Sequence, residues 1–253
     1  MSIKKIIRYP IKGFNGEFLE SVLLLPNSTL PGDRKYAFAK HDNTIKEDSP
    51  SYMKKTNFLA LVKEEKLSLL NSELNLENKI LKLKHKKEII FVGSLEKEED
   101  LIKLSTSISK FLGFDLEKKP RLVTDKSEYK DHSFSDIPDK AVSFINLNTV
   151  KDFEKKINQQ IDYKRFRGNI IFDGIKAWEE FNWIEKKIKI GEVEFQIFRK
   201  TKRCAATEVN PQNGKRDINV PNQLYKIYGH SDLGVYGLVL NKGSIKTGDE
   251  IKI

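Results

Sequence analysis

The stretch RFRGNIIFDGIKAWEEFNWIEKKIKIGEVEFQIFRK, residues 165–200, decides the fold expected for this chain. It contains three runs, RGNIIFDG, WIEKKIKIG and VEFQIFR, whose bulky apolar residues and closing turns are typical of short β-strands. Gly191 lies where a hairpin between two of these runs would turn. Similar runs, YGLVLNKG and DEIKI, follow near the end of the chain. Many short strands joined by tight turns favour a barrel or a compact sandwich.

Upstream, the sequence predicts a mixture of strands and helices. Short strands are expected over residues 3–11, 17–25 and 35–40, and an antiparallel meander from Phe58 to Val92. We therefore expect a mainly β fold with some α (α+β), in which a mixed β/α N-terminal portion packs on a C-terminal β-barrel. The expected division is 1–115 and 116–253.

Two helices are expected between these strand-rich parts. An apolar stripe from Leu101 to Leu112 predicts a helix that ends at Gly113. Thr149 is the expected N-cap of a second helix that runs toward Ile161. Residues 119–140 are polar and contain two prolines, so we expect a loop that crosses between the halves.

Composition narrows the function classes. The 253 residues include no apolar run approaching the ~20 that a membrane-spanning helix needs, and no secretory h-region. We expect a cytoplasmic protein. The net charge of +10 comes mostly from lysines scattered among acidic residues, which favours a solvated surface over a nucleic-acid groove. A basic pocket for a phosphorylated small molecule stays open, because only a few charges need to converge there.

Cys204 is the single cysteine, so an internal disulfide is excluded. A free cysteine is often only a small buried hydrophobe. Here Lys200, Lys202 and Arg203 surround it in sequence, and nearby cations stabilise the thiolate form that attacks or binds metal. A thiolate is a soft donor suited to a sulfur-rich metal centre. The four histidines are scattered, which disfavours an ordinary zinc or non-haem iron site.

Five segments, taken in order, resemble the signatures of one family. They are YPIKG (9–13), LPGDRKYAF (30–38), RFRGNIIFDG (165–174) followed by AWEEFNW, RCAATEVNPQNG (203–214) and GVYGLVLNKGSIKTGDEI (234–251). The chain resembles the MOSC family, the module shared by the C-terminus of molybdenum cofactor sulfurases and by amidoxime-reducing proteins. Two positions depart from the family pattern: Gly13 replaces a frequent Ser, and Gly168 replaces a frequent Pro.

The resemblance implies a molybdenum–molybdopterin cofactor whose metal is held by the catalytic Cys204. The implied cofactor-binding residues are Lys12, Gly13, Arg34, Asn146, Thr149, Arg167, Asn169 and Arg203. Planar guanidinium groups can grip a phosphate bidentately, and Lys12 would add a point charge. Thr149 could equally be an ordinary helix cap, and Asn169 a strand-edge turn residue.

The activity implied is the two-electron reduction of small N-hydroxylated compounds. Its electrons would come from a separate ferredoxin-like, haem or flavin reductase partner, because one cysteine cannot hold a cluster that needs about four thiolates. Two alternatives stay open. The chain could be a cofactor carrier or sulfur-transfer module that uses a Cys204 persulfide, or a basic binding protein without catalytic activity.

Overall fold

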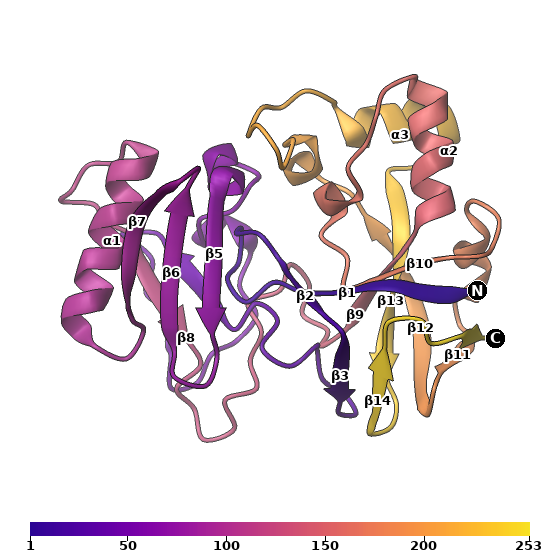
Figure 1. Cartoon of the computed structure of the whole chain (residues 1–253), viewed down its shortest axis with the longest axis horizontal. Coiled ribbons are helices and arrows are strands. Elements are labelled where there is room, and N and C mark those ends of the chain that lie inside the picture. Colours follow the sequence, from indigo (N-terminus) through magenta and orange to yellow (C-terminus); the bar gives the residue numbers. More distant parts are fainter.

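The computed structural model describes all 253 residues, and these form two units that lie side by side (Figure 1). Fifteen strands and three α-helices make up the regular structure, with five short 3₁₀ turns between them. The mainly β, α+β fold expected from the sequence is confirmed.

The larger unit is an eight-stranded sheet with the order β15-β11-β12-β13-β9-β10-β1-β2, antiparallel except for the β9–β10 pair. Its strands are β1 (Ser2–Arg8), β2 (Glu17–Leu19), β9 (Val142–Asn146), β10 (Ile170–Asp173), β11 (Lys187–Ile190), β12 (Val193–Lys202), β13 (Asp232–Val239) and β15 (Ile251–Lys252). The sheet curls until the two ends of the chain meet. The amide of Ile3 donates to the carbonyl of Asp249 at 2.9 Å, and the amide of Ile251 to that of Met1 at 3.0 Å.

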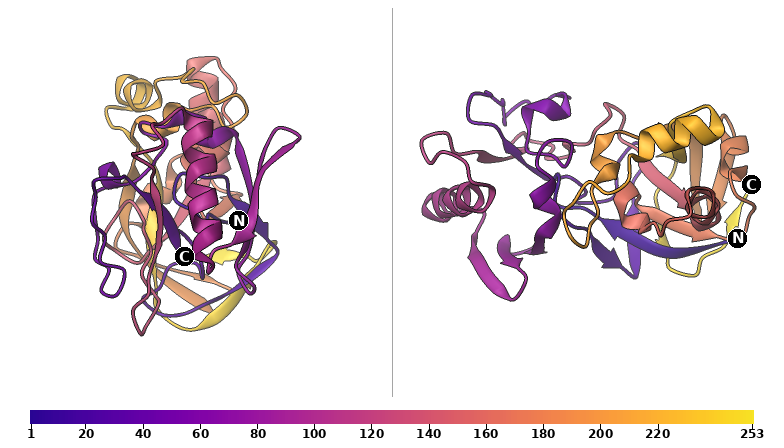
Figure 2. Two further views of the ribbon diagram at one scale, coloured as in Figure 1. Left: turned by 90° about the vertical axis from the view of Figure 1, so that its left-hand side faces the viewer. Right: turned by 90° about the horizontal axis from the view of Figure 1, so that it is seen from above.

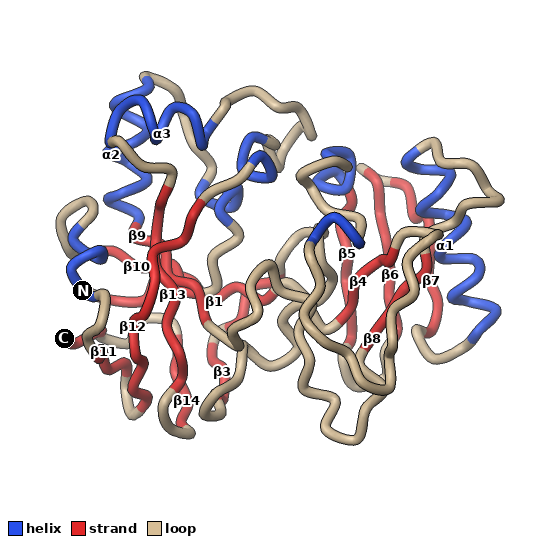
Figure 3. Tube along the Cα trace, turned by 180° about the vertical axis from the view of Figure 1, so that it is seen from behind, coloured by secondary structure: helices blue, strands red, loops and turns tan.

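The inner face of this sheet holds the largest apolar core. Alternation along β12 buries Val193, Phe195 and Ile197, as expected for a strand with one face inward. The short pair β3 (Ser21–Leu24) and β14 (Gly243–Lys246) adds to the same core. Helices α2 (Leu147–Ile157) and α3 (Val220–Tyr228) lie together beside one end of the sheet (Figure 3).

The smaller unit has its own apolar core. It contains the meander β5 (Leu70–Asn75), β6 (Ile80–His85) and β7 (Glu88–Ser94), helix α1 (Glu98–Leu112), and the pair β4 (Tyr36–Ala39) and β8 (Arg121–Thr124). Figure 2 shows α1 running along one side of this unit. Leu104 and Ile108 are the fully buried apolar residues of α1. The helix ends at Gly113, which takes the left-handed conformation with φ 78°, so the predicted end of α1 is confirmed.

Four sequence-based expectations about elements are wrong. Residues 58–69 form loops and a 3₁₀ turn rather than strands, and β8 lies inside the segment expected to be a loop. Helix α2 has Asn146 rather than Thr149 as its N-cap, because the Asn146 side chain accepts from the amide of Asn148 at 3.0 Å. Helix α3 was not expected, although Asn219 caps it and a proline stands in its first turn.

The chain crosses between the units more than once. Strands β1 and β2, from the first 20 residues, pair within the larger unit, whereas residues 36–124 supply most of the smaller one. The single division near residue 115 stays a prediction. No helix is both long enough and apolar enough to cross a bilayer. The crossings matter for function, because they bring residues from distant parts of the sequence to one seam.

Candidate functional site

A cavity of about 540 Å³ lies between the two units. Of its 26 lining residues, nine are Lys or Arg and only two, Asp33 and Asp136, are acidic. The cations come from both units. The segments that contain Lys12 and Lys55 lie on one side of the cavity, and they face β12 and the segment before β10 on the other side. Such an excess of positive charge in a partly enclosed space favours an anionic ligand.

The sulfur of Cys204 lies in this cavity at the end of β12, where the strand gives way to a 3₁₀ turn over residues 205–208. Cys204 is a free cysteine of intermediate exposure, so its thiol is neither bridged nor sealed in apolar packing. The ammonium of Lys55, which comes from the other side of the seam, lies 3.0 Å from the sulfur. Burial opposes the charge of Lys55, but the contact with Cys204 outweighs it and raises the lysine pKa. The positive charge of Lys55 is therefore favoured beside the sulfur.

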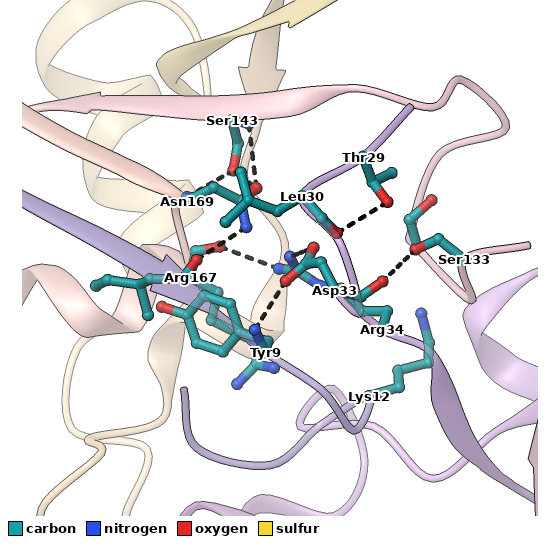
Figure 4. Close-up of polar contacts among 12 residues, drawn as sticks. Tyr9, Lys12, Thr29, Leu30, Asp33, Arg34, Ser133, Ser143, Arg167 and Asn169 are labelled. Atoms are coloured by element: carbon teal, nitrogen blue, oxygen red, sulfur yellow. Dashed lines mark hydrogen bonds and ion pairs between the residues drawn. The ribbon is translucent and has the colours of Figure 1, made fainter. Parts of the chain in front are cut away.

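Two arginines stack against the ring of Tyr9 (Figure 4). The guanidinium carbons of Arg34 and Arg167 lie 4.7 Å and 4.3 Å from the ring centroid. Arg34 forms an ion pair with Asp33 and donates to the carbonyl of Arg167 at 3.1 Å. The Nη1 atom of Arg167 donates a hydrogen bond to the carbonyl of Phe14, whereas its buried Nη2 atom has no partner. A buried donor without a partner indicates a missing acceptor in this part of the cavity.

The surroundings of Arg167 disfavour its positive charge. Burial first, and then the neighbouring positive charge of Arg34, lower the Arg167 pKa to about 10. Arg34 differs, because the Asp33 carboxylate outweighs its burial and raises its pKa. An anion bound beside Arg167 would relieve the repulsion between the two guanidinium groups.

Lys12 forms the opposite wall with Asp136. Its ammonium donates to the carbonyl of Phe134 at 2.8 Å and pairs with the carboxylate of Asp136. Burial lowers the Lys12 pKa, although Asp136 opposes this. Burial also disfavours the charge of Asp136, but Lys12 prevails and lowers its pKa to about 2. Asp136 therefore remains a carboxylate at neutral pH and fixes Lys12 in place.

Two other predicted residues line the cavity but have their polar groups engaged. The guanidinium of Arg203 donates to the carbonyls of Leu233 and Phe166. The Asn169 oxygen accepts from the backbone and hydroxyl of Ser143, and its nitrogen donates to the carbonyl of Ile7. Their hydrogen bonds tie the cavity wall to the barrel. Gly13 also lines the cavity, with a positive φ of 85° that favours glycine there.

Asn146 and Thr149 are not among the residues that line the cavity, and their interpretation as cofactor contacts stays a prediction. Both hold the fully buried carboxyl of Glu180: Thr149 donates to it at 2.7 Å, and Asn146 at 2.9 Å. Thr149 also accepts from the amide of Trp178 at 2.8 Å. Their role is to join α2 to the segment after β10, since a buried carboxyl must be hydrogen-bonded.

Lys55 and Asp136 were missed by sequence reasoning. Lys55 is one of two adjacent lysines in a polar segment, and nothing in that segment shows which lysine faces the seam. Asp136 lies in the segment that was expected to be an unstructured loop. Each becomes recognisable only when the two units are brought together.

The donor set limits the kind of metal centre that fits. No group of three or more His, Cys, Asp or Glu side chains is placed to hold a bare metal ion. One soft sulfur in a cavity lined by nine cationic side chains fits instead a metal that arrives with ligands of its own, inside an anionic complex. The partnerless Arg167 Nη2 and the size of the cavity agree with this. The residues present therefore fit a phosphorylated pterin that holds a metal.

The fold and cavity define a class: a β-barrel protein with a cationic, cysteine-bearing pocket at the seam with a second unit. Residues 130–252 match the family model described as the MOSC domain. Residues 130–252 are therefore a MOSC domain, and the resemblance of the chain's motifs to that family is confirmed.

Named relatives agree with this assignment. Mitochondrial amidoxime reducing component 2 of Rattus norvegicus is 28% identical over 166 residues, which is 58% of this chain and 48% of the relative. The protein of the same name from Homo sapiens is 32% identical over 121 residues, covering 43% and 34%. Molybdenum cofactor sulfurase of Drosophila ananassae is 31% identical over 108 residues, covering 42% and 13%. The chain thus matches less than half the length of these relatives.

Among solved structures, the YUAD protein from Bacillus subtilis aligns with 99% of this chain and 93% of its own, with a TM-score of 0.45 and 10% identity.

Proposed function

We propose that this protein is a molybdenum-cofactor-dependent oxidoreductase that reduces small N-hydroxylated compounds with electrons from a separate donor protein. One observation carries the proposal: a partly exposed cysteine sulfur lies in a cavity where nine cationic side chains face two carboxylates. The relatives named as amidoxime reducing components support the type of reaction.

In this proposal the anionic end of the cofactor is held by the cations that have hydrogen-bonding capacity left. Arg167 has a free buried nitrogen, and the ammonium of Lys12 has one donor beyond its contacts with Phe134 and Asp136. Arg34 stands between them on the ring of Tyr9. Because these groups are fixed by stacking and ion pairs, little ordering is needed when a phosphate binds.

Cys204 would be the protein's ligand to the molybdenum, and Lys55 would hold its sulfur in place before the cofactor arrives. When bound, the cofactor supplies the two-electron oxygen-atom chemistry, while the protein supplies binding, orientation and charge. The half-exposed position of Cys204 leaves the reacting side open to small substrates.

The electrons need an outside source. The chain has one cysteine, whereas an iron–sulfur cluster needs about four thiolates. A ferredoxin-like, haem or flavin reductase is therefore the proposed partner.

The decisive experiment compares wild type with Cys204→Ser. Both are expressed with the molybdenum cofactor, molybdenum content is measured, and turnover of benzamidoxime is followed with a chemical reductant. We expect near-stoichiometric molybdenum and turnover in wild type, and loss of both in Cys204→Ser. Inorganic phosphate should still bind the variant, which shows that the cavity is intact. Wild-type protein that contains molybdenum but shows no turnover would contradict the reductase proposal.

A second candidate function is sulfur transfer through a persulfide on Cys204. The relatives named molybdenum cofactor sulfurase favour it, and so does the Lys55 ammonium beside the sulfur, which would stabilise a persulfide anion. Intact-protein mass spectrometry separates the two candidates. A stable gain of one sulfur mass on Cys204 in protein without molybdenum would favour sulfur transfer.

A further inference from the structure

A second cavity, of about 250 Å³, lies behind the wall of the first. Arg165 and Arg167 line both cavities, so the two spaces share a wall. The second cavity also lies on the seam: Phe14 belongs to the core of the smaller unit, while Phe18 lies on β2 and Lys164 precedes β10. None of the residues considered so far as cofactor ligands, apart from Arg167 and Gly13, lines it.

Positive charge in this second cavity is not balanced. Arg165 is paired with Asp217 at 2.6 Å, but Lys164 and Arg167 have no carboxylate partner. The one acidic residue of the lining, Asp162, accepts from the amide of Lys164 through its side chain. It caps a turn there instead of neutralising a cation. The cavity therefore has one exposed and one buried cation available for an anion.

An aromatic surface faces the same space. The ring of Phe18 is 53% exposed and lines the second cavity. The ammonium groups of Lys5 and Lys164 lie 5.4 Å and 5.7 Å from its centroid. Phe14 and Tyr9 add further aromatic lining. A flat ring placed against Phe18 would bury apolar surface while its substituent stays near the cations.

We infer that this second cavity binds a planar aromatic anion, a ring joined to a phosphate or carboxylate. The ring lies against Phe18, and the anionic group lies beside Lys164, where Arg167 forms part of the wall shared with the first cavity. The aromatic surface and the positive charge are both needed. The aromatic surface alone would also accept a neutral ring, and the positive charge alone would also accept a bare phosphate or carboxylate. The inference does not depend on the cofactor or on the proposed reaction.

The test is calorimetric titration of the full chain with phenyl phosphate and, separately, with its halves, phenol and inorganic phosphate. Benzoate distinguishes a carboxylate ligand from a phosphate. Amide shifts of Asn15 and Gln212, which line only the second cavity, locate the binding. We expect phenyl phosphate to shift both amides, with an affinity measured at these amides at least about tenfold tighter than that of phenol or inorganic phosphate.

Two variants and a control variant test which side chains bind the aromatic anion. Lys164→Met and Phe18→Ala should each weaken binding of the aromatic anion about fivefold to tenfold. Lys155→Met, on an exposed lysine in the last turn of α2, should change nothing. Both altered side chains are exposed, so the fold should persist, which circular dichroism verifies. Unchanged affinity in Lys164→Met, or an aromatic anion that shifts the amides of Asn15 and Gln212 no more readily than inorganic phosphate does, would overturn the inference.

Discussion

Arg165 and Arg167 are two residues apart and have opposite surroundings. Arg165 is buried against the carboxylate of Asp217, whereas Arg167 lies partly buried beside another guanidinium and has no carboxylate partner, although each keeps one buried nitrogen without a hydrogen-bond partner. The first arrangement stabilises the fold. The second stores unfavourable electrostatic energy that only a bound anion removes.

Replacement of these two arginines should therefore act in opposite directions. We expect Arg167→Met to raise the free energy of unfolding by about 1 kcal/mol while abolishing most phosphate binding. The matched change Arg165→Met should lower the free energy of unfolding by about 2 kcal/mol, because the half-buried Asp217 loses its partner. Urea denaturation measures both. A loss of stability in Arg167→Met equal to that in Arg165→Met would show that Arg167 is structural.

The Lys12–Asp136 pair predicts a pH dependence. The folded-state pKa of Asp136, about 2, lies below its ordinary value of 3.8, so the pair stabilises the fold above about pH 4. This stabilisation is lost as the pH falls from about 4 to 2. We expect Asp136→Asn to lower the free energy of unfolding by about 1 kcal/mol at pH 7, a figure reduced for solvent screening of the half-exposed carboxylate.

Measurement of unfolding at several pH values checks this. The gap between wild type and Asp136→Asn should narrow steadily below pH 4. A gap of constant size down to pH 2 would mean that the asparagine disturbs packing instead of removing a charge.

At the scale of elements, α2 is fixed by a buried carboxyl. Thr149 and Asn146, at its N-terminus, both donate to Glu180, which comes from the segment after β10. Burial raises the pKa of Glu180, although the hydrogen bonds from Asn146 and Thr149 oppose that shift. These bonds orient the helix against the barrel, away from the cationic cavity.

Thr149→Val tests this assignment. The variant keeps the shape of the side chain but removes the hydroxyl, so the Glu180 carboxyl and the amide of Trp178 each lose a partner. We expect the free energy of unfolding to fall by about 2 kcal/mol, with phosphate affinity unchanged. Thr106→Val on α1 is the control, because its hydroxyl bonds only within its own helix and to Lys119. Weakened phosphate binding in Thr149→Val would return this residue to the site.

The elements that were predicted correctly share a strong local signal. Helix α1 has an apolar stripe and a glycine at its end, and β11 and β12 alternate around the turn at Gly191. Strand β8 was missed because only four residues, RLVT, separate polar neighbours, and its pairing with β4 is non-local. The N-cap of α2 was misplaced because Asn146 and Thr149 are both good capping residues, and tertiary contacts decided between them.

The residues of the site also divide into those that a local motif reveals and those that only distant contacts identify. Seven of the nine predicted site residues line the cavity, and their motifs could be recognised in the sequence. Which of them retain free donors could not be read from the sequence, because the hydrogen bonds of Asn169 and Arg203 run to distant backbone carbonyls. Lys55 and Asp136 could not be recognised as site residues for the same reason, because their partners, Cys204 and Lys12, lie far from them in the sequence.

At the scale of the whole molecule, the first cavity lies at the interface between two units that each have an apolar core of their own. A ligand that contacts Lys12 and Arg34 on one side and Arg167 on the other must stabilise the units together. A ligand that binds only the folded protein stabilises it by about 2.7 kcal/mol at a concentration of 100 times its Kd.

Phosphate should therefore slow amide hydrogen exchange in both units at once. We expect protection in β6 of the smaller unit as well as in β12 of the larger one, and little of it in Lys12→Met. Lys252→Met, on an exposed lysine in the last strand, is the control. Protection confined to one unit would mean that the ligand does not bridge the seam.

The closure of the barrel through its own ends has a practical result. Since the carbonyl of Met1 accepts from the amide of Ile251, and Ser2 and Glu250 form an isolated β-bridge, residues 1 and 251 are neighbours in space. A short glycine linker could join them, and new ends could be cut in the exposed loop near Lys130. Such a circular permutant should keep every strand in register, and its refolding would show whether the barrel can fold with its strands connected in this new order.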